Sequence, residues 1–273
     1  MEKDEIATLG SDNIATSGNA LWAFVGTLCL MSLPFWLIGA ASRWHPLPGL
    51  PASALAFICP GVTALLLVKK QYGTAATTRL AKRILDYKRV KKIWCAPILL
   101  FMPILTVATY FIMRWNGTIL PSGHTPISSI PVLFILFFVT AVGEELGWTG
   151  YLLAPLRSRW GTLGAGIMIG VIWALWHVIP LLQAHRSVHW IAWWGVGTVA
   201  QRVLMVWFYT DTGESLFAAV LYHAMANLSW QAFPIFGSHW NPQVAGILIV
   251  LSAIVAIGWD VSVGRTDTFP DTL

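Results

Sequence analysis

The chain has 273 residues, of which 56% are hydrophobic and only 11% are charged, with a formal net charge of +5. A soluble globular domain carries about 25% charged residues, so this composition excludes an ordinary soluble enzyme and favours a multi-pass membrane protein. The sixteen tryptophans fit a membrane protein, because indole rings favour the membrane–water interface. Cys29, Cys59 and Cys95 are scattered through apolar segments, which is typical neither of a disulfide framework nor of a zinc site.

The chain divides into a polar N-terminal segment, residues 1–20, a multi-pass domain, residues 21–260, and a tail, residues 261–273. The first segment lacks the basic region of a signal peptide, so we expect the first apolar run to stay as a membrane anchor. Windows of about 20 apolar residues predict about eight transmembrane helices. They are Leu21–Ala41, Leu50–Val68, Ile93–Met113, Pro131–Leu153, Leu163–Leu182, Trp190–Phe208, Ser215–Phe233 and Val244–Trp259. The runs are too long and continuous for barrel strands, so the expected fold is an all-α membrane protein.

Residues 69–92 hold nine lysines and arginines against one acid, Asp86. The positive-inside rule places this segment in the cytoplasm, and an even number of spans then places both termini there, at the cell membrane. Arg157 and Arg159 fall on the same side. Topology explains these charges, so lipid rather than nucleic acid is the expected partner. Leu80, Ile84 and Tyr87 recur at i, i+4 and i+7, which predicts a short basic amphipathic helix on the inner leaflet.

Glu144 and Glu145 lie in an otherwise apolar stretch, residues 131–156. A charge near the bilayer centre costs at least ~2.5–3.5 kcal/mol, so each glutamate is a candidate functional residue. Neighbours on a helix point about 100° apart, so one can face a cavity while the other orients a nearby group. Gly143 and Gly147 flank the pair at a spacing that permits close approach of another helix.

Two histidines lie in later apolar stretches. His177 follows Trp173 by one helical turn, and such a lone histidine has the alternative of a structural role, donating to a carbonyl. His223 and Asn227 are four residues apart and share one helix face. We expect Glu144 and these three residues to line one polar cavity within the bundle.

The residue types in this set suit hydrolysis. A buried carboxylate can serve as general base, and a histidine can share the water or protonate the leaving amine. A second histidine and an asparagine can donate hydrogen bonds to the oxyanion of a tetrahedral intermediate. Ser215 and Ser229 lack a nucleophile-elbow motif, so water activated by Glu144 is favoured over a serine nucleophile.

Three blocks resemble the CPBP family of intramembrane endopeptidases, the CAAX proteases and bacteriocin-processing, Abi-like enzymes. Glu144-Glu145-Leu-Gly-Trp-Thr149 is similar to the family's EExxxR block, and Trp173-Ala-Leu-Trp-His177 to its FxxxH block. Thr212-Gly-Glu-Ser-Leu, followed by His223-Ala-Met-Ala-Asn227, is similar to its HxxxN block. The resemblance centres on residues 131–230. It implies a membrane peptidase acting on a peptide or protein substrate, with Glu144 as catalytic base and with His177, His223 and Asn227 as further catalytic residues.

The sequence departs from the family pattern at Thr149, where the family has arginine, and this change puts the supporting role of that arginine in doubt. Arg202 lies in the sixth expected span, where an unpaired charge is costly. We expect it to face the bundle, pair with an acid and partly replace the missing arginine near Glu145. The alternative is that Arg202 reaches phosphate headgroups at the inner interface.

The sequence leaves alternatives open both for metal dependence and for catalytic activity. Glu144, His177 and His223 suit a zinc site with an open position, but the chain lacks HExxH, and glutamate with histidine can activate water unaided. We therefore expect no required cofactor, with zinc as the alternative. Thr149 favours a second function, a catalytically inactive family member acting as a scaffold or immunity factor. A proton-coupled carrier would also use buried glutamate and histidine, but the sequence has no internal repeat.

Overall fold

The computed structural model describes residues 17–42, 44–121 and 125–264. The expected N-terminal segment and tail lie mostly outside these residues. The described residues form eight α-helices and no β-strand beyond one isolated bridge. The helices are α2 Ser17–Ala41, α3 Cys59–Lys82, α4 Lys92–Trp115, α5 Ile130–Gly147, α6 Leu153–Gln183, α7 Val188–Asp211, α8 Leu216–Ala232 and α9 Pro242–Ser262. The all-α fold is confirmed, and each expected span overlaps one of these helices. The first half of Leu50–Val68 is an exception in detail, because it falls on a 3₁₀ helix, Ala52–Ile58, that precedes α3.

Length and apolar composition alone mark five stretches of the described residues as able to cross a membrane. One of them, Ile127–Gln183, runs through both α5 and α6. The helices α7 and α8 are not among the five. Helix α8 has only 17 residues, and α7 carries Gln201 and Arg202 in its middle. Helix α8 is therefore left out by its length, whereas α7 is left out because it carries polar side chains in its middle.

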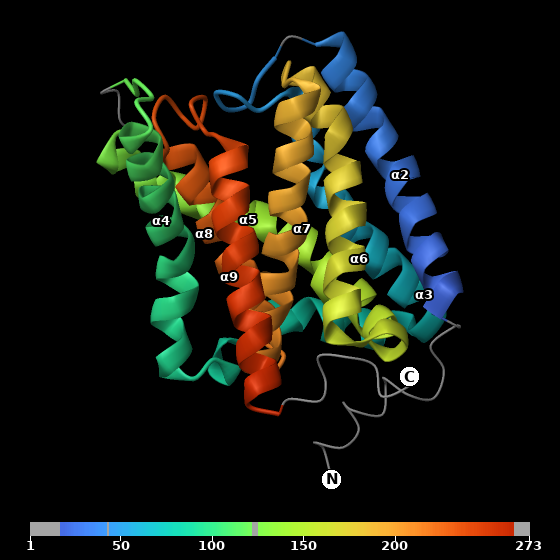
Figure 1. Ribbon diagram of the computed structural model, residues 1–273. Coiled ribbons are helices and arrows are strands. Elements are labelled where there is room, and N and C mark those ends of the chain that lie inside the picture. The colour runs from blue at the N-terminus through green and yellow to red at the C-terminus, as the bar shows by residue number, and fades with distance from the viewer. Residues whose placement is uncertain (1–16, 43, 122–124, 265–273) are drawn as a thin grey trace.

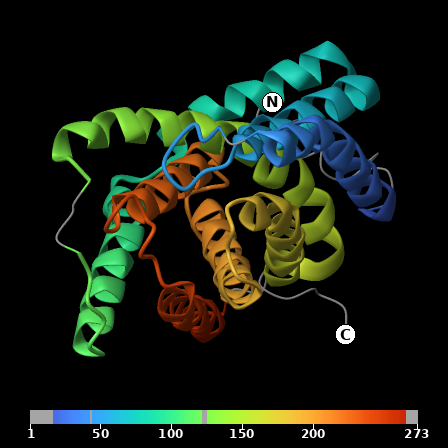
Figure 2. The ribbon, with the colours of Figure 1, turned by 90° about the horizontal axis from the view of Figure 1, so that it is seen from above.

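The bundle has two distinct ends (Figure 1). One end, here called the basic end, carries residues 69–92, 157–160 and 211–215, with the start of α2 and the end of α9. The opposite end, here called the mouth end, carries residues 44–51, 184–187 and 233–241. Figure 2 looks onto the mouth end and shows α5 lying across one side of the bundle, oblique to α6, α7 and α9.

Glycines set the closest helix contacts. A Cβ atom added to Gly147 would lie 2.5 Å from the carbonyl oxygen of Pro60, and one on Gly143 would lie 2.8 Å from that of Phe57. A Cβ atom on Gly170 of α6 would lie 2.8 Å from the Cα atom of Val199 on α7. The close approach expected at Gly143 and Gly147 is confirmed, and it fixes how α5 is rotated against α3.

The chain after Glu145 continues into a π-helix, Trp148–Leu152, before α6 begins. Single turns of this kind often occur at functional sites because they redirect side chains within a helix. The reversal between the fourth and fifth expected spans comes later, at Gly161, where φ is 67°. Only glycine adopts such a φ at no steric cost.

The expected amphipathic helix is only partly correct. Helix α3 bends at Gly73 and ends at Lys82, and two short 3₁₀ turns, Arg83–Leu85 and Tyr87–Arg89, follow it. Leu80 is buried and Ile84 packs against the core, but Tyr87 is 54% exposed. The stripe stops short of Tyr87 because the helical period ends before that residue is reached.

Polar contacts hold the basic end together. The carboxylate of Asp86 accepts hydrogen bonds from the backbone N–H groups of Leu216 and Phe217, at 3.1 and 3.0 Å, and so caps α8. Arg157 and Glu214 form an ion pair at 2.7 Å. Asp86 and Arg157 thus tie the segment after α3 and the start of α6 to the link between α7 and α8.

Candidate active site

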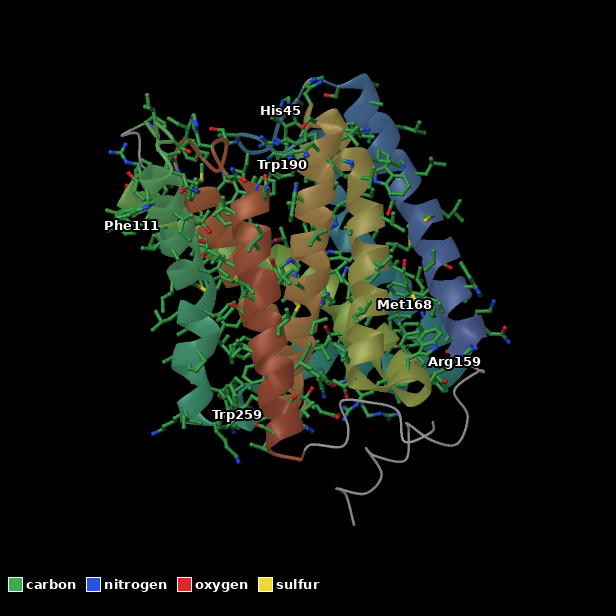
Figure 3. All side chains as sticks on the ribbon, viewed as in Figure 1. His45, Phe111, Arg159, Met168, Trp190 and Trp259 are labelled. Atoms are coloured by element: carbon green, nitrogen blue, oxygen red, sulfur yellow. The ribbon has the colours of Figure 1, made fainter. Side chains whose placement is uncertain are left out.

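A cavity of about 210 Å³ lies among α5, α6, α7, α8 and α9. Its deep part is lined by Glu144, Trp173, His177, His223 and Asn227. Its outer part is lined by residues of the mouth end, including Gly49, Arg186, Trp190 and Trp240. Figure 3 shows Trp190 and His45 at this end, and Arg159 and Trp259 at the other. The four residues expected to share a cavity do so, and the cavity extends from them towards the mouth end.

Glu144 comes from α5 and is 5% exposed. Its Oε2 atom accepts a hydrogen bond of 2.7 Å from the indole Nε1–H of Trp173 on α6. Among the described residues this is the one hydrogen bond that the Glu144 side chain makes. The carboxylate is therefore oriented on one side and keeps acceptor capacity for a bound molecule on the other.

The ring of His177 is also oriented from α6. Its Nδ1 atom lies 2.9 Å from the carbonyl oxygen of Trp173, and a carbonyl only accepts, so Nδ1 carries the proton. The ring packs between Trp176 and Trp194, with centroids 4.7 and 5.2 Å away. The structural role considered above is thus present, as a bond within one helix. It leaves Nε2 as the remaining polar atom of a residue that lines the cavity.

Glu145 has different surroundings. Its Oε2 atom accepts from Arg202 Nη1 at 2.8 Å and from Thr149 Oγ1 at 2.5 Å, and its Oε1 atom lies 2.8 Å from His223 Nδ1. Glu145 and Arg202 are fully buried, and Arg202 also lies over the ring of Trp173, with Cζ 4.3 Å from the centroid. We call Glu145, Thr149, Arg202 and His223 the buried charge network.

The expected pairing of Arg202 with an acid is confirmed, and the alternative of headgroup contact is wrong because the side chain is 0% exposed. Thr149 donates to the same carboxylate oxygen as Arg202. Thr149, at the position of the family's arginine, and Arg202 of α7 therefore bind the same oxygen atom of Glu145. Glu145, Thr149 and Arg202 do not line the cavity, whereas His223 belongs to both the network and the cavity wall.

The donor set fits a metal poorly. In the described part of the chain no three side chains of histidine, cysteine, aspartate or glutamate stand together as a metal site would require. The Nδ1 atoms of both histidines are engaged, one with the Trp173 carbonyl and one with Glu145, but metal-binding histidines are oriented in the same way, so these bonds do not bear on the zinc alternative. Metal dependence through Glu144, His177 and His223 stays a prediction.

Sequence analysis missed the aromatic residues around the site and one cation. Trp176 and Trp194 flank His177, although the tryptophans as a group suggested only the membrane interface. Trp176 also donates to Ser32 on α2 at 2.9 Å, which anchors α6 against the outer helix. The sequence analysis gave Arg186 no role. For Trp176 the available signal was its spacing from Trp173, directly before His177.

Comparisons with known proteins agree with these residues. The family model described as type II CAAX prenyl endopeptidase, Rce1-like, matches residues 126–229, which hold the deep cavity residues and the buried charge network. CAAX prenyl protease 2 of Methanococcus maripaludis is 25% identical over 224 residues, 77% of this chain and 79% of the relative. With the three motif blocks assembled around one cavity, the chain is similar to the Rce1-like CAAX prenyl endopeptidases over the residues that build its candidate site.

Proposed function

We propose that the protein hydrolyses a peptide bond of a membrane-associated or leader-peptide substrate, with water activated by Glu144. One observation carries this proposal. Of two adjacent glutamates, Glu145 is bound by three side chains, whereas Glu144 lines the cavity with a single orienting hydrogen bond. A general base must reach the proton that it removes, directly or through one water, and Glu144 has that access.

In the proposed reaction the Glu144 carboxylate takes a proton from water. The hydroxide oxygen bonds to the scissile carbonyl carbon, and the carbonyl electron pair moves to its oxygen. When the C–N bond breaks, its electron pair stays on nitrogen, which receives the proton held by Glu144. His177 can accept a hydrogen bond from the same water at Nε2 while it is neutral. One water is consumed, and Glu144 returns to the carboxylate.

Asn227 is the proposed donor to the oxyanion. Its amide NH₂ donates in every protonation state of the site, and it shares the cavity wall with His223 one turn away. His223 is held at Nδ1 by Glu145, so Nε2 is the atom that it has left for substrate or water. The buried charge network then acts on the reaction through the position of His223.

The inactive-member alternative rests on Thr149. We propose that Arg202 supplies the missing guanidinium from α7, because it binds the same oxygen of Glu145 that Thr149 binds. The network is then complete, and an active protease is favoured over a scaffold. No metal enters the proposed reaction, so dialysis against a zinc chelator is expected to leave the cleavage rate unchanged.

We propose that the basic end faces the cytoplasm, as the positive-inside rule requires. The cavity would then be entered from the extracytoplasmic side, since its outer part is lined by the mouth end. An impermeant maleimide should label a cysteine placed at Ser187 in intact cells and one at Lys88 only after lysis. The reverse labelling pattern would overturn this orientation.

The test of the function compares membranes that contain the parent with membranes that contain Glu144→Gln. Reconstituted protein is incubated with membrane proteins and peptides, and new termini are mapped by mass spectrometry. We expect cleavage products that require Glu144 and that persist in chelator. Equal product sets from the two proteins would overturn the proposed hydrolysis.

A further inference from the structure

Gln201 lies in the middle of α7, directly before Arg202, and it lines the cavity without a role in the reaction proposed above. Consecutive residues of a helix point about 100° apart. Arg202 points towards Glu145 and binds it, whereas Gln201 faces the cavity. The two residues of α7 therefore differ as Glu144 and Glu145 differ on α5, because one binds protein and the other is open to a ligand.

The side-chain amide of Gln201 has no hydrogen-bond partner among the described residues. The residue is partly buried, and its amide atoms are not among the polar atoms that the bundle closes off completely. A polar group inside an apolar bundle costs free energy unless it is hydrogen-bonded. The NH₂ donors and the carbonyl acceptor of Gln201 are thus available to a molecule that enters the cavity.

Polar side chains are scarce in the deep wall of the cavity. Besides the tryptophans and the four residues given a part in the reaction, the polar lining residues are Ser53, Thr140, Arg186, Thr198 and Gln201. Thr140 donates to a carbonyl of its own helix, and the hydroxyl of Ser53 is closed off from the cavity. Arg186 belongs to the outer part. Helix α7 therefore supplies the remaining polar groups of the deep wall, through Thr198 and Gln201.

Contacts between α6 and α7 give the depth of Gln201. A Cβ atom on Gly170 would lie 3.2 Å from the Cβ atom of Arg202, so Gln201 stands level with this part of α6. Gly170 lies two helical turns beyond His177 as counted from the mouth end, about 10 Å at 1.5 Å per residue. Helix side chains lean towards the N-terminus, which for α7 is the mouth end, so the amide reaches back towards the reacting groups. Gln201 therefore borders the inner side of the site.

The direction of Gln201 is fixed by contacts on two sides of α7. On one side Arg202 pairs with Glu145 at 2.8 Å. On the other side a Cβ atom on Gly197 would lie 3.2 Å from the Cα atom of Gly246 on α9. Figure 2 shows α7 between α6 and α9. Because α7 cannot turn without breaking these contacts, it presents the amide to the cavity from a rigid element.

We propose that Gln201 is a substrate-binding residue that pairs with one peptide group of the substrate beside the scissile bond. A carboxamide carries an acceptor and two donors, so it matches the N–H and C=O groups of a peptide backbone whatever the side chains are. A peptide at membrane depth must satisfy these groups, because unpaired backbone is costly away from water. Thr198 adds a hydroxyl one turn nearer the mouth. The inference rests on the proposed function, since it places the peptide against Glu144.

Two other roles compete with this one for Gln201. A residue that only packs in the bundle would affect the cleavage of every peptide alike. A second oxyanion donor beside Asn227 would also act on every peptide alike, because it would contact the scissile carbonyl alone. A residue that binds another peptide group loses its effect when that group is altered in the substrate. The roles therefore differ in whether the effects of altering the protein and the peptide are additive.

The probe is a synthetic peptide that spans a cleavage site mapped by the comparison of parent and Glu144→Gln. In a series of esters, oxygen replaces one backbone N–H group at a time, at every position except the scissile bond. Parent, Gln201→Leu and Gln183→Leu are reconstituted in vesicles of phosphatidylethanolamine and phosphatidylglycerol, and kcat/KM is measured for each peptide. Gln183 is the matched control, because it is also partly buried, binds the carbonyl of Trp36 at 2.9 Å and does not line the cavity.

We expect one ester beside the scissile bond to lower kcat/KM of the parent by about fivefold or more, the size of one lost hydrogen bond. Gln201→Leu should lower kcat/KM of the all-amide peptide by a similar factor. The same ester should then cost this variant less than about twofold further. The other esters should act equally on parent and variant, and Gln183→Leu should keep the full sensitivity of the parent.

Additive effects at every ester position, or an unchanged kcat/KM in Gln201→Leu, would overturn this role of Gln201 and leave Glu144-dependent cleavage standing. Additive effects with a loss in kcat alone would assign Gln201 to the oxyanion instead. The absence of any Glu144-dependent cleavage would overturn both proposals. Should Gln201→Leu not fold, Gln201→Ala takes its place, and the inference requires it to show the same insensitivity to that one ester.

Discussion

Glu144 and Glu145 are neighbours in sequence, yet they belong to two regions of the site with different construction. Glu145 sits in the buried charge network, where a guanidinium, a hydroxyl and an imidazole bind its two oxygens. Glu144 faces the cavity and has one indole donor. The difference teaches that an identical side chain becomes structural or reactive according to how many of its acceptor sites the protein already occupies.

This contrast predicts two kinds of damage. Changes in the buried charge network should lower stability, because they leave a charge without its partner in a dry interior. Changes on the cavity side should lower the rate and leave folding intact, because the cavity already accommodates polar groups without protein partners. Each substitution below is chosen to separate these two outcomes.

Glu144→Gln should give the largest loss of activity. Glutamine keeps the shape and can still accept from Trp173, but it cannot take a proton, and loss of a general base costs ~10²–10⁴-fold in rate. Cleavage rate and thermal unfolding in detergent are the measurements, with the parent Tm expected. If the purified variant cleaves as fast as the parent, Glu144 is not the base and Glu145 becomes the next candidate.

Arg202→Ala should give the largest loss of stability. It leaves Glu145 charged and uncompensated in a position that is 0% exposed, and breaking a buried pair in this way costs ~3–5 kcal/mol. Denaturant unfolding in detergent measures the loss, and activity should fall with it because His223 loses its fixed support. An Arg202→Ala protein with parent stability and rate would show that the network is not required.

The double variant with Thr149→Arg and Arg202→Ala tests whether an arginine at position 149 can replace Arg202. The new arginine would lie one turn from Glu145 on the same face, where the threonine already contacts the carboxylate. We expect recovery of part of the activity and stability lost in the single variant. Thr149→Lys serves as control, since it restores the charge without the planar pair of donors. No recovery with either residue would mean that Arg202 does not replace the family's arginine.

The sequence predicted the eight helices, the four cavity residues and the buried pairing of Arg202, because each depends on polar residues in apolar runs. Helix geometry alone, however, did not predict which of the two glutamates faces the cavity. Helix α5 is apolar on every side, so periodicity gives the angle between Glu144 and Glu145 but no absolute rotation. That rotation depends on the contacts of Gly143 and Gly147 with residues of another helix, which carry no local signal. For the same reason the sequence did not predict the hydrogen bond from Trp173 to Glu144.

Asn227→Ala tests the oxyanion donor on the cavity side. Removing one such donor costs about 10²–10³-fold in kcat. We expect a loss of this size, smaller than the loss caused by Glu144→Gln. Ser229→Ala is the control, because Ser229 lies on the same helix and does not line the cavity. A change in KM alone would assign Asn227 to substrate binding. Loss of stability equal to that of Arg202→Ala would place it with the structural residues.

Trp173→Phe should give the smallest effect, because the family's own block has phenylalanine at this position. The aromatic ring over Arg202 is kept, while the indole donor to Glu144 is lost. A hydrogen bond to a charged group contributes ~1.5–3 kcal/mol, but water in the cavity can replace the donor, so we expect a loss in kcat of about tenfold or less. Trp207→Phe is the matched control, since it removes an indole bond of 3.1 Å to another carboxylate, Asp260, far from the site. If both variants lose the same activity, the bond does not orient Glu144. If only Trp173→Phe slows cleavage, with its Tm unchanged, then the one donor on the open glutamate acts on the reaction, while the three donors on its neighbour act on the fold.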